Sequence, residues 1–300
     1  LETYHWLLQH GIEFRSLEAV SGHSVPRGHI IDPYQAIQSL HRKIRDLPNV
    51  TIRLNAPALR LLATQGRIDR VLYEHAGQRH TAWAGKGVIV ATGGFAKSEE
   101  LLSQFAPHLK QALRIAGEGN TGDGLRMAWE HGAWVRDLPY LSGTYGFHPS
   151  ATGTVKTQGL AFYKGGIIVN QQGKRFVNES VSYKQIGNAA LRQKDGISYQ
   201  IWDQTVMDQS VADDPLYDLE LLRRRRLLYQ TDTLEELAEC IDVDPDVLIE
   251  TINRYNEGIA RGAEPDFGRK ALTHNYGRPP PTTKPPFYAF ESTVAMLATY

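Results

Sequence analysis

Residues 165–179 read GGIIVNQQGKRFVNE, and this stretch decides the fold more than any other part of the chain. The apolar run at residues 166–170 is typical of a buried strand, and residues 175–178 are typical of a second, shorter strand. The Gln-Gln-Gly between them is typical of a tight turn. The sequence therefore predicts a β-hairpin, and we expect Arg175 and Glu179, which bracket the second strand, to form a charged pair that holds it.

The composition excludes several classes of protein. The chain has 300 residues, which suggests about two domains, and Lys plus Arg equal Asp plus Glu at 33 each. This neutral balance argues against a nucleic-acid-binding protein, which needs clustered basic residues. The single cysteine, Cys240, excludes a disulfide framework and a cysteine-based zinc site, and we expect no other metal site.

The sequence contains no membrane signal. No apolar run approaches the roughly 20 residues that a transmembrane helix needs. The first residues also lack the charged and then apolar pattern of a secretory signal segment. Because a single cysteine also fits a reducing compartment, we expect a soluble, cytoplasmic protein.

Helix and strand patterns alternate over the first half of the chain. Apolar spacing predicts helices at Leu1–His10, ended by Gly11, and at Tyr34–Arg45, and strands at Ile12–Phe14, Val50–Leu54, Leu59–Leu62 and Ile68–Tyr73. Gly87–Ala91 reads GVIVA and is bounded by glycines, so we expect a fully buried strand there. The alternation predicts an α/β layer architecture.

The last third of the chain contains clear helix starts. Thr233, followed three residues later by Glu236, is a capping box that predicts one helix. Asp244, followed by a proline in the first helical position, predicts the next helix. A proline-rich connector then leads to an expected final strand at Phe287–Glu291.

Two glycine-rich segments are candidate ligand sites. Ala91–Phe95 reads ATGGF and follows the expected buried strand, where two glycines let the backbone approach a dinucleotide. An ordinary strand-to-helix turn explains this pentapeptide equally well. Gly117–Gly124 reads GEGNTGDG and opens an expected helix, forming a nest of N–H groups for an anion or a polarised carbonyl. Within it, Asp123 would either bind a sugar or ribityl hydroxyl or cap the helix.

The order of these segments closely resembles one flavoprotein family. ATGGF, GNTGDG at a helix start, the dipeptide His148–Pro149 and the hairpin follow one another as in soluble fumarate reductases, succinate dehydrogenase flavoprotein subunits and 3-ketosteroid dehydrogenases. The later segments Arg254–Asn256, Asp266–Arg269 and Phe287–Phe290 are also similar to that family. The likeness covers essentially the whole chain.

This resemblance implies a flavoprotein of two parts. A partial Rossmann-like FAD-binding domain would span residues 1–143, and an inserted α+β clamp or catalytic domain would span residues 144–300, with substrate between them. Family members begin with a GxGxxG turn and return to the flavin domain through a glycine pair just after the position of Tyr300; this sequence has no such turn before residue 117 and ends before that pair. We therefore expect the middle of a longer polypeptide, which by itself does not retain FAD.

The resemblance also implies which residues contact the cofactor. Ala58 would contact the adenine side through its backbone. The rest of FAD would lie along residues of the two glycine-rich segments, namely Thr92, Gly93, Asn120, Thr121, Gly122, Asp123 and Gly124.

Tyr183 stands where fumarate reductases of this family carry their proton-donating arginine. Residues 148–165 contain no carboxylate to relay a proton, and residues 295–299 lack the histidines that grip a dicarboxylate. The site is therefore more similar to delta-1 3-ketosteroid dehydrogenases, which carry a tyrosine after the Asn-Glu as proton acceptor.

That likeness implies FAD-dependent dehydrogenation of a C–C bond next to a carbonyl. The reaction needs a base for the α-proton, here Tyr183, and flavin N5 to accept the β-hydride. Because the ordinary pKa of tyrosine is near 10, its neighbours must lower that value for action at about pH 7. His148 would bind a substrate oxygen. Structural roles also fit: packing or a buried hydrogen bond for Tyr183, and a domain-junction hydrogen bond for His148.

Two alternative functions stay open. One is a reductase of an unsaturated acid or enone, with Tyr183 as proton donor, and the other is a non-catalytic protein that keeps only the fold. We expect a small-molecule substrate, poor activity with fumarate, and an electron acceptor or donor of unknown identity. Gly143, Gly146 and Pro149 suit a hinge between the two domains.

Overall fold

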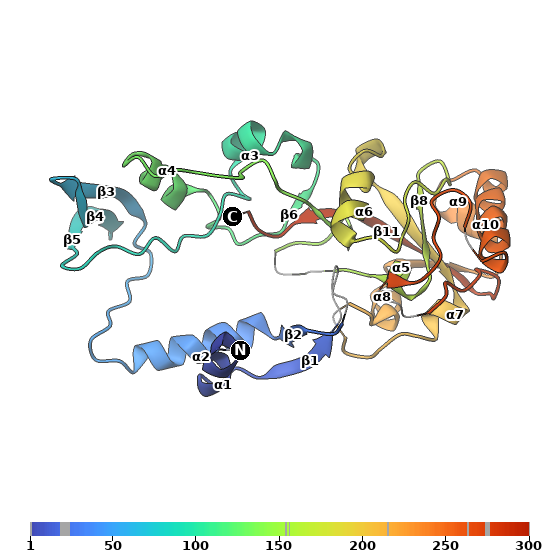
Figure 1. Cartoon of the computed structure of the whole chain (residues 1–300), viewed down its shortest axis with the longest axis horizontal. Coiled ribbons are helices and arrows are strands. Elements are labelled where there is room, and N and C mark those ends of the chain that lie inside the picture. The colour runs from blue at the N-terminus through green and yellow to red at the C-terminus, as the bar shows by residue number, and fades with distance from the viewer. Residues whose placement is uncertain are drawn as a thin grey trace. The chain divides into compact units, whose positions relative to one another are not determined.

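The structure is a computed structural model that describes residues 2–18, 25–153, 155, 157–214, 216–262, 264–273 and 277–299. Its elements divide between two compact units (Figure 1). The first unit comprises Leu1–Ala91 and Met127–Ala133, and the second comprises Thr92–Arg126 and Trp134–Tyr300.

The first unit begins with two helices and a two-stranded antiparallel sheet. These elements are α1 (Glu2–Gln9), β1 (Phe14–Glu18), β2 (Gly28–Ile31) and α2 (Pro33–Arg45). Gly11, at φ 74°, takes the left-handed conformation that ends α1, as predicted. Asp32 caps α2, because its carboxylate accepts the backbone N–H groups of Tyr34 and Gln35.

A three-stranded antiparallel sheet follows in the first unit. Its strands, in spatial order, are β3 (Ala58–Thr64), β4 (Arg67–His75) and β5 (Gln78–Trp83). The predicted strands at Leu59–Leu62 and Ile68–Tyr73 are therefore confirmed. His131 donates from Nε2 to the carbonyl of Leu61 at 2.9 Å, and this hydrogen bond connects the segment Met127–Ala133 to the sheet.

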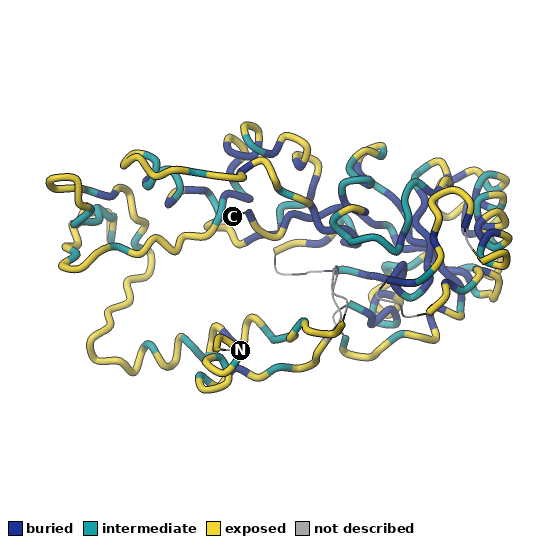
Figure 2. Tube along the Cα trace, in the orientation of Figure 1, coloured by how far each residue is buried: buried dark blue, intermediate teal, exposed yellow. Residues whose placement is uncertain are grey.

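Two strands predicted for the first unit are wrong. Val50–Leu54 and Gly87–Ala91 form no ladder, and Ile89 is 92% exposed. Figure 2 shows the first unit mostly as exposed or intermediate residues. A strand is stable only where neighbours accept its backbone hydrogen bonds and cover its side chains, and no described strand pairs with either segment.

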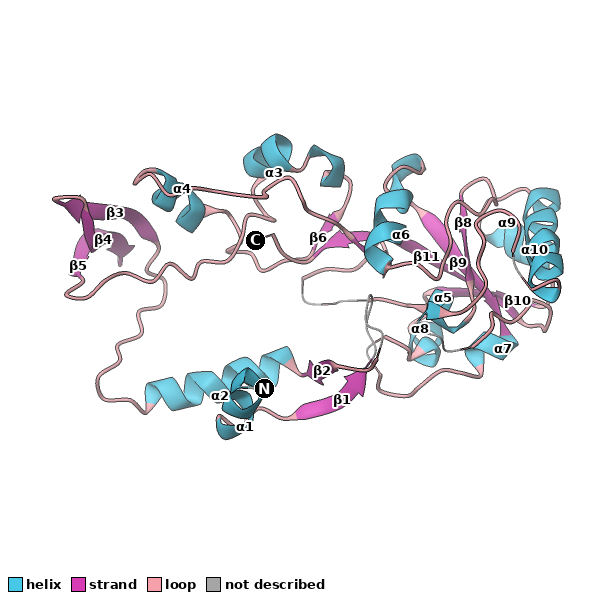
Figure 3. Cartoon of the chain, viewed as in Figure 1, coloured by secondary structure: helices cyan, strands magenta, loops and turns pink. Residues whose placement is uncertain are grey.

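The second unit is built around the long strand β11 (Phe287–Met296), which runs through a six-stranded sheet (Figure 3). The other strands are β6 (Leu113–Arg114), β7 (Thr144–Phe147), β8 (Ile167–Asn170), β9 (Ser198–Asp203) and β10 (Leu228–Thr231). The first half of β11 pairs antiparallel with β9 and β10, and its second half pairs antiparallel with β7 and parallel with β6. The predicted final strand is confirmed and continues to Met296.

Successive side chains of β11 point to opposite faces of this sheet. Phe287 and Ala289 join a buried apolar cluster with α9 and α10, whereas Tyr288 and Phe290 join a second cluster with α5, α7 and α8. The bounds of these helices are α5 (Ala161–Lys164), α7 (Gln204–Met207), α8 (Leu219–Arg224), α9 (Leu234–Cys240) and α10 (Pro245–Ala260). Helices therefore cover both faces of the sheet.

The two C-terminal helices begin where the sequence predicts. Thr233 Oγ1 accepts the backbone N–H of Glu236 at 3.2 Å and caps α9. Asp244 caps α10 by accepting the N–H groups of Asp246 and Val247, with a proline in the first helical position. Both predicted helices are confirmed.

Only the first strand of the predicted hairpin is confirmed. β8 is buried and is followed by the predicted turn, but residues 175–178 do not form a strand. Arg175 alone pairs there, in an isolated bridge with Val169. Side-chain contacts replace the expected ladder, since the carboxylate of Glu179 accepts the N–H of Ile168 at 3.1 Å.

The described chain is thus a mixed helix and sheet protein. Its remaining helices are α3 (Glu99–Phe105), η1 (Pro107–Leu109), α4 (Asp123–Trp129), α6 (Tyr183–Ala190) and η2 (Lys194–Gly196). None of the helices in the described ranges is both long and apolar enough to cross a lipid bilayer. In the same ranges, no three His, Cys, Asp or Glu side chains gather so as to hold a metal ion.

Candidate functional site

The two glycine-rich segments lie side by side in the second unit. Gly94 donates its N–H to Asn120 Oδ1 at 3.1 Å, and its carbonyl accepts the N–H of Gly122 at 3.1 Å. These bonds bring together the cofactor residues predicted in both segments, namely Thr92 and Gly93 with Asn120, Thr121, Gly122, Asp123 and Gly124. Ala58, by contrast, opens β3 in the first unit.

The glycines within this contact leave no room for a side chain. A Cβ atom on Gly94 would lie 1.9 Å from the carbonyl oxygen of Thr299, and one on Gly122 would lie 2.3 Å from Leu101 Cδ1. Residues 92–93 are exposed, so a ligand can approach the backbone of this turn directly. Exposed backbone on a tightly packed glycine turn fits a dinucleotide cofactor.

Asp123 is the first residue of α4 and accepts the hydroxyl of Thr121 on Oδ2 at 2.8 Å. The residue is exposed. Because an ionised carboxylate has about four acceptor positions, Asp123 keeps capacity for a ligand hydroxyl beside this local bond.

Tyr183 opens α6, a helix whose start is fixed by a capping box. The Ser182 hydroxyl accepts backbone N–H groups of the first turn, and Gln185 Oε1 accepts the N–H of Ser182 at 3.3 Å. The N–H of Tyr183 itself donates to the hydroxyl of Tyr163 at 3.1 Å. The backbone that carries the candidate base is therefore held firmly.

Lys184 is a functional candidate that the sequence analysis misses. Its ammonium lies 5.4 Å from the centroid of the Tyr183 ring and donates to Thr144 Oγ1 at 2.7 Å and to the carbonyl of Ser142 at 3.4 Å. Burial lowers the pKa of this ammonium. The only signal in the sequence is a lysine directly after the tyrosine, which no spacing rule singles out.

His148 follows β7 and is held in one tautomer. Ser150 donates its backbone N–H to His148 Nδ1 at 3.2 Å, and Ser150 Oγ lies 2.7 Å from the same nitrogen. Because Nδ1 accepts, the proton of the neutral ring is on Nε2. Burial lowers the pKa of His148, and the charge of Glu291 offsets only part of this effect. Near pH 7, His148 is therefore a neutral ring whose Nε2–H can donate to a substrate oxygen.

The two catalytic candidates flank one strand. Lys184, next to Tyr183, bonds to Thr144 at the start of β7, and His148 comes directly after the last residue of that strand. Four extended residues span at most about 13 Å.

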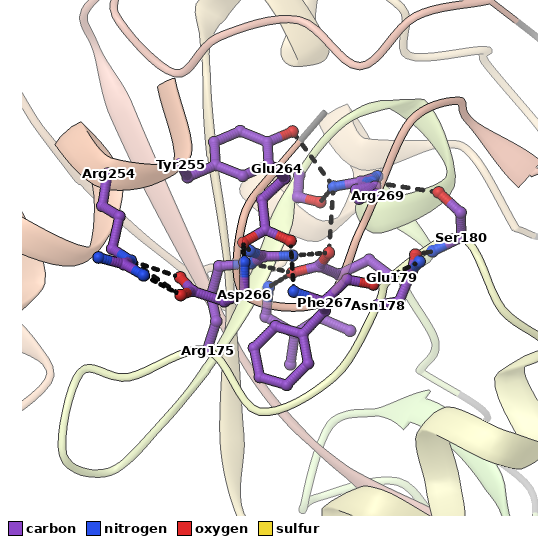
Figure 4. A network of polar contacts seen from close by, with 12 residues as sticks. Arg175, Asn178, Glu179, Ser180, Arg254, Tyr255, Glu264, Asp266, Phe267 and Arg269 are labelled. Atoms are coloured by element: carbon purple, nitrogen blue, oxygen red, sulfur yellow. Dashed lines mark hydrogen bonds and ion pairs between the residues drawn. The ribbon is translucent and has the colours of Figure 1, made fainter. Parts of the chain in front are cut away.

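A network of four buried charged side chains holds the segment before Tyr183 (Figure 4). Arg175 forms ion pairs of 2.7 Å with both Glu179 and Glu264, and Arg269 lies 3.4 Å from Glu179. All four side chains are at most 2% exposed. Two positive charges thus balance two negative ones in a region without solvent.

The network also reaches the backbone. Arg269 donates to the carbonyl of Phe162 at 2.7 Å and to Ser180 Oγ at 3.2 Å. Burial raises the pKa of Glu179, but Arg269 and Arg175 outweigh it, so the pKa lies below its usual range and the carboxyl is ionised. The predicted charged pair of Arg175 and Glu179 is confirmed, and its contacts are structural.

Comparison with known proteins identifies the family. A model of the FAD binding domain family matches residues 9–300, so the chain belongs to this family, and the predicted cofactor, FAD, is confirmed. Among curated proteins, the "Fumarate reductase (cytochrome)" of Shewanella frigidimarina is 30% identical over 227 residues, which cover 75% of this chain and 38% of that protein. The chain therefore spans less than half the length of this relative.

Solved structures show the same fold. The open conformation of a flavocytochrome c3 fumarate reductase matches with a TM-score of 0.74 and 23% identity, covering 99% of this chain and 51% of that chain. The 3-ketosteroid delta1-dehydrogenase from Sterolibacterium denitrificans, in complex with 1,4-androstadiene-3,17-dione, matches with a TM-score of 0.69 and 24% identity, covering 91% and 53%. The resemblance to these two groups of flavoproteins, predicted from the sequence motifs, is confirmed.

Proposed function

We propose that the whole protein is an FAD-dependent oxidoreductase that dehydrogenates a C–C bond next to a carbonyl group. The observation that carries this proposal is the environment of Tyr183 at the start of α6. Its backbone N–H donates to the hydroxyl of Tyr163, and the ammonium of Lys184 lies near its ring. A phenol in such a place can exchange a proton with a substrate, which is what removal of an α-proton requires.

When bound, FAD supplies the acceptor for a hydride, and residues of this chain do the rest. Thr92, Gly93 and residues 120–124 would hold the cofactor, with Ala58 on the adenine side. The packed Gly94 turn and the acceptor positions of Asp123 support this assignment.

In the proposed reaction Tyr183 takes the proton from the α-carbon. A hydride leaves the β-carbon, and the electrons of the broken α-C–H bond form the new C=C bond. His148, as a neutral Nε2–H donor, binds the carbonyl oxygen and stabilises the negative charge that develops on it. An electron acceptor of unidentified class must then regenerate the oxidised enzyme.

We also propose that residues 1–143 belong to a partial Rossmann-like FAD-binding domain and residues 144–300 to an inserted clamp. The start of β7 at Thr144 supports a boundary near Gly143. Limited proteolysis of the whole protein should cut at residues 143–150, and less so with ligand bound. Absence of cleavage there under both conditions would argue against a mobile junction.

A second candidate is a reductase of an unsaturated acid or enone, with Tyr183 as the proton donor. The fumarate reductase relative favours this direction. Tyr183 and the absence of a carboxylate between His148 and Gly165 favour substrate oxidation over fumarate reduction.

The test uses the purified whole protein. We expect a flavin absorption spectrum, bleaching of that spectrum by a saturated carbonyl compound, and slow reoxidation of the reduced flavin by fumarate. A colourless protein that cannot be reconstituted with FAD would refute the enzyme proposal. Reoxidation by fumarate within the usual enzymatic range, about 1–1,000 per second, would instead establish the second candidate.

A further inference from the structure

Lys184 is a cation in a half-buried place, and its acceptors are neutral. The ammonium donates to Thr144 Oγ1 and to the carbonyl of Ser142, at 2.7 and 3.4 Å. Among the described residues, no carboxylate forms an ion pair with it, and burial alone lowers its pKa. A half-buried ammonium whose acceptors are neutral keeps its charge uncompensated, so that charge can act on a neighbouring group.

The helix that carries Lys184 is packed closely against the segment that holds its ammonium. A Cβ atom on Gly187, one turn further along α6, would lie 2.8 Å from the carbonyl oxygen of Gly143. Because only glycine permits this approach, the backbone of α6 lies directly against the segment that carries Ser142 and Thr144.

Other charged and titratable groups near α6 are already engaged. Glu179 pairs with Arg175 and Arg269, and burial keeps the pKa of Tyr145 far above its usual value. Glu291 of β11 acts on His148. The remaining groups lie around the later turns of α6, where His108, Lys110 and Arg192 line a cavity with Asn188.

We propose that Lys184 is a positioning residue that orients the Tyr183 ring and stabilises its phenolate during proton transfer. This inference rests on the proposed role of Tyr183. The ammonium lies 5.4 Å from the centroid of the Tyr183 ring, and a unit charge within roughly 8 Å of a phenol in a partly buried site shifts its titration by about one to two pH units. Such a shift moves a phenol from its ordinary value near 10 toward the working range of an enzyme.

The test is a tyrosinate absorbance titration of the whole flavoprotein, recorded as the difference between each protein and its Tyr183→Phe counterpart. The difference isolates one phenol. We expect Lys184→Met to raise its titration midpoint by about one to two pH units, and Lys184→Arg to restore most of the shift. The pH profile of turnover should move in the same direction.

Lys164→Met is the matched control, because Lys164 lies 4.5 Å from the centroid of the Tyr217 ring in a similar contact elsewhere. It should leave the Tyr183 titration unchanged. Lys184→Gln replaces the methionine variant if that protein melts at a clearly lower temperature.

An unchanged midpoint in the Lys184 variants would overturn this inference and leave the role of Tyr183 intact. Full turnover in Tyr183→Phe would overturn the proposed function, and the positioning role with it, whatever the titration shows.

Discussion

Two apolar runs of this chain have nearly the same sequence and opposite environments. Gly166–Asn170 reads GIIVN, and Gly87–Ala91 reads GVIVA. In the structure Ile168 of the first run is fully buried, whereas Ile89 of the second is 92% exposed. Apolar character alone therefore does not make a buried strand.

The difference lies in what surrounds each run. β8 pairs with β9 along one edge, and on the other side the N–H of Ile168 goes to the carboxylate of Glu179. On that side, a carboxylate of the buried network of Arg175, Glu179, Glu264 and Arg269 accepts the backbone hydrogen bond that a neighbouring strand would otherwise accept. No described residue provides the second run with a ladder partner.

The largest effect should come from breaking the network that borders β8. Arg269→Met leaves Glu179 with one fewer partner in a buried site, so we expect a loss of about 3–5 kcal/mol in the free energy of unfolding. Urea unfolding followed by circular dichroism measures it. Arg223→Met is the control, because its ion pair with Glu220 is exposed and should change stability little. Equal effects of the two variants would contradict the structural role of the network.

Matched truncations compare the two runs directly. Ile168→Ala should cost about 2–5 kcal/mol, because it leaves a cavity in the core. Ile89→Ala should stay within about 0.5 kcal/mol, since an exposed side chain has little contact to lose. Thermal and urea unfolding of both variants measure these two losses in the free energy of unfolding. A similar cost at both positions would show that the second run is also covered.

Lowering the pH should weaken the contact of Glu179 with the first run, and we expect the resulting loss in the free energy of unfolding to be the smallest of these effects. The pKa of Glu179 is lowered in the folded state, so the unfolded chain takes up its proton first as the pH falls. The stabilisation is complete above the unfolded value of about 4.3 and is lost as the pH falls through the lower folded value. Urea unfolding measured from pH 7 down to about pH 3 should show the loss that Glu179 causes only below about pH 4.3 in the wild type, and a smaller loss in Glu179→Gln. Equal losses would disprove the assignment.

Features that depend on near neighbours are predictable from this sequence. The caps at Thr233 and Asp244 and the helix end at Gly11 involve residues a few positions apart, so propensity and spacing suffice. The two glycine-rich segments are in contact through the hydrogen bond from the Gly94 N–H to Asn120 Oδ1, and their role in holding the cofactor stays a prediction.

Features that depend on distant partners are not predictable in this way. Ser180 and Arg269 are 89 residues apart, and a single sequence does not show that such residues meet. For the same reason the sequence around Glu264 does not predict its ion pair with Arg175. Nor does the sequence predict which of the two apolar runs is buried. Lys184 is recognisable as a candidate only once Thr144 is placed beside it.

The central claim is that Tyr183 transfers the proton, and Tyr183→Phe tests it most directly. The variant removes one hydroxyl and keeps the ring, so flavin content and melting temperature should be unchanged. Turnover with a saturated carbonyl substrate, measured by stopped-flow flavin reduction in the whole protein, should fall by roughly 100- to 10,000-fold. Turnover within a few-fold of the wild type, with about 1 kcal/mol of lost stability, would instead assign the hydroxyl a structural hydrogen bond and contradict the account.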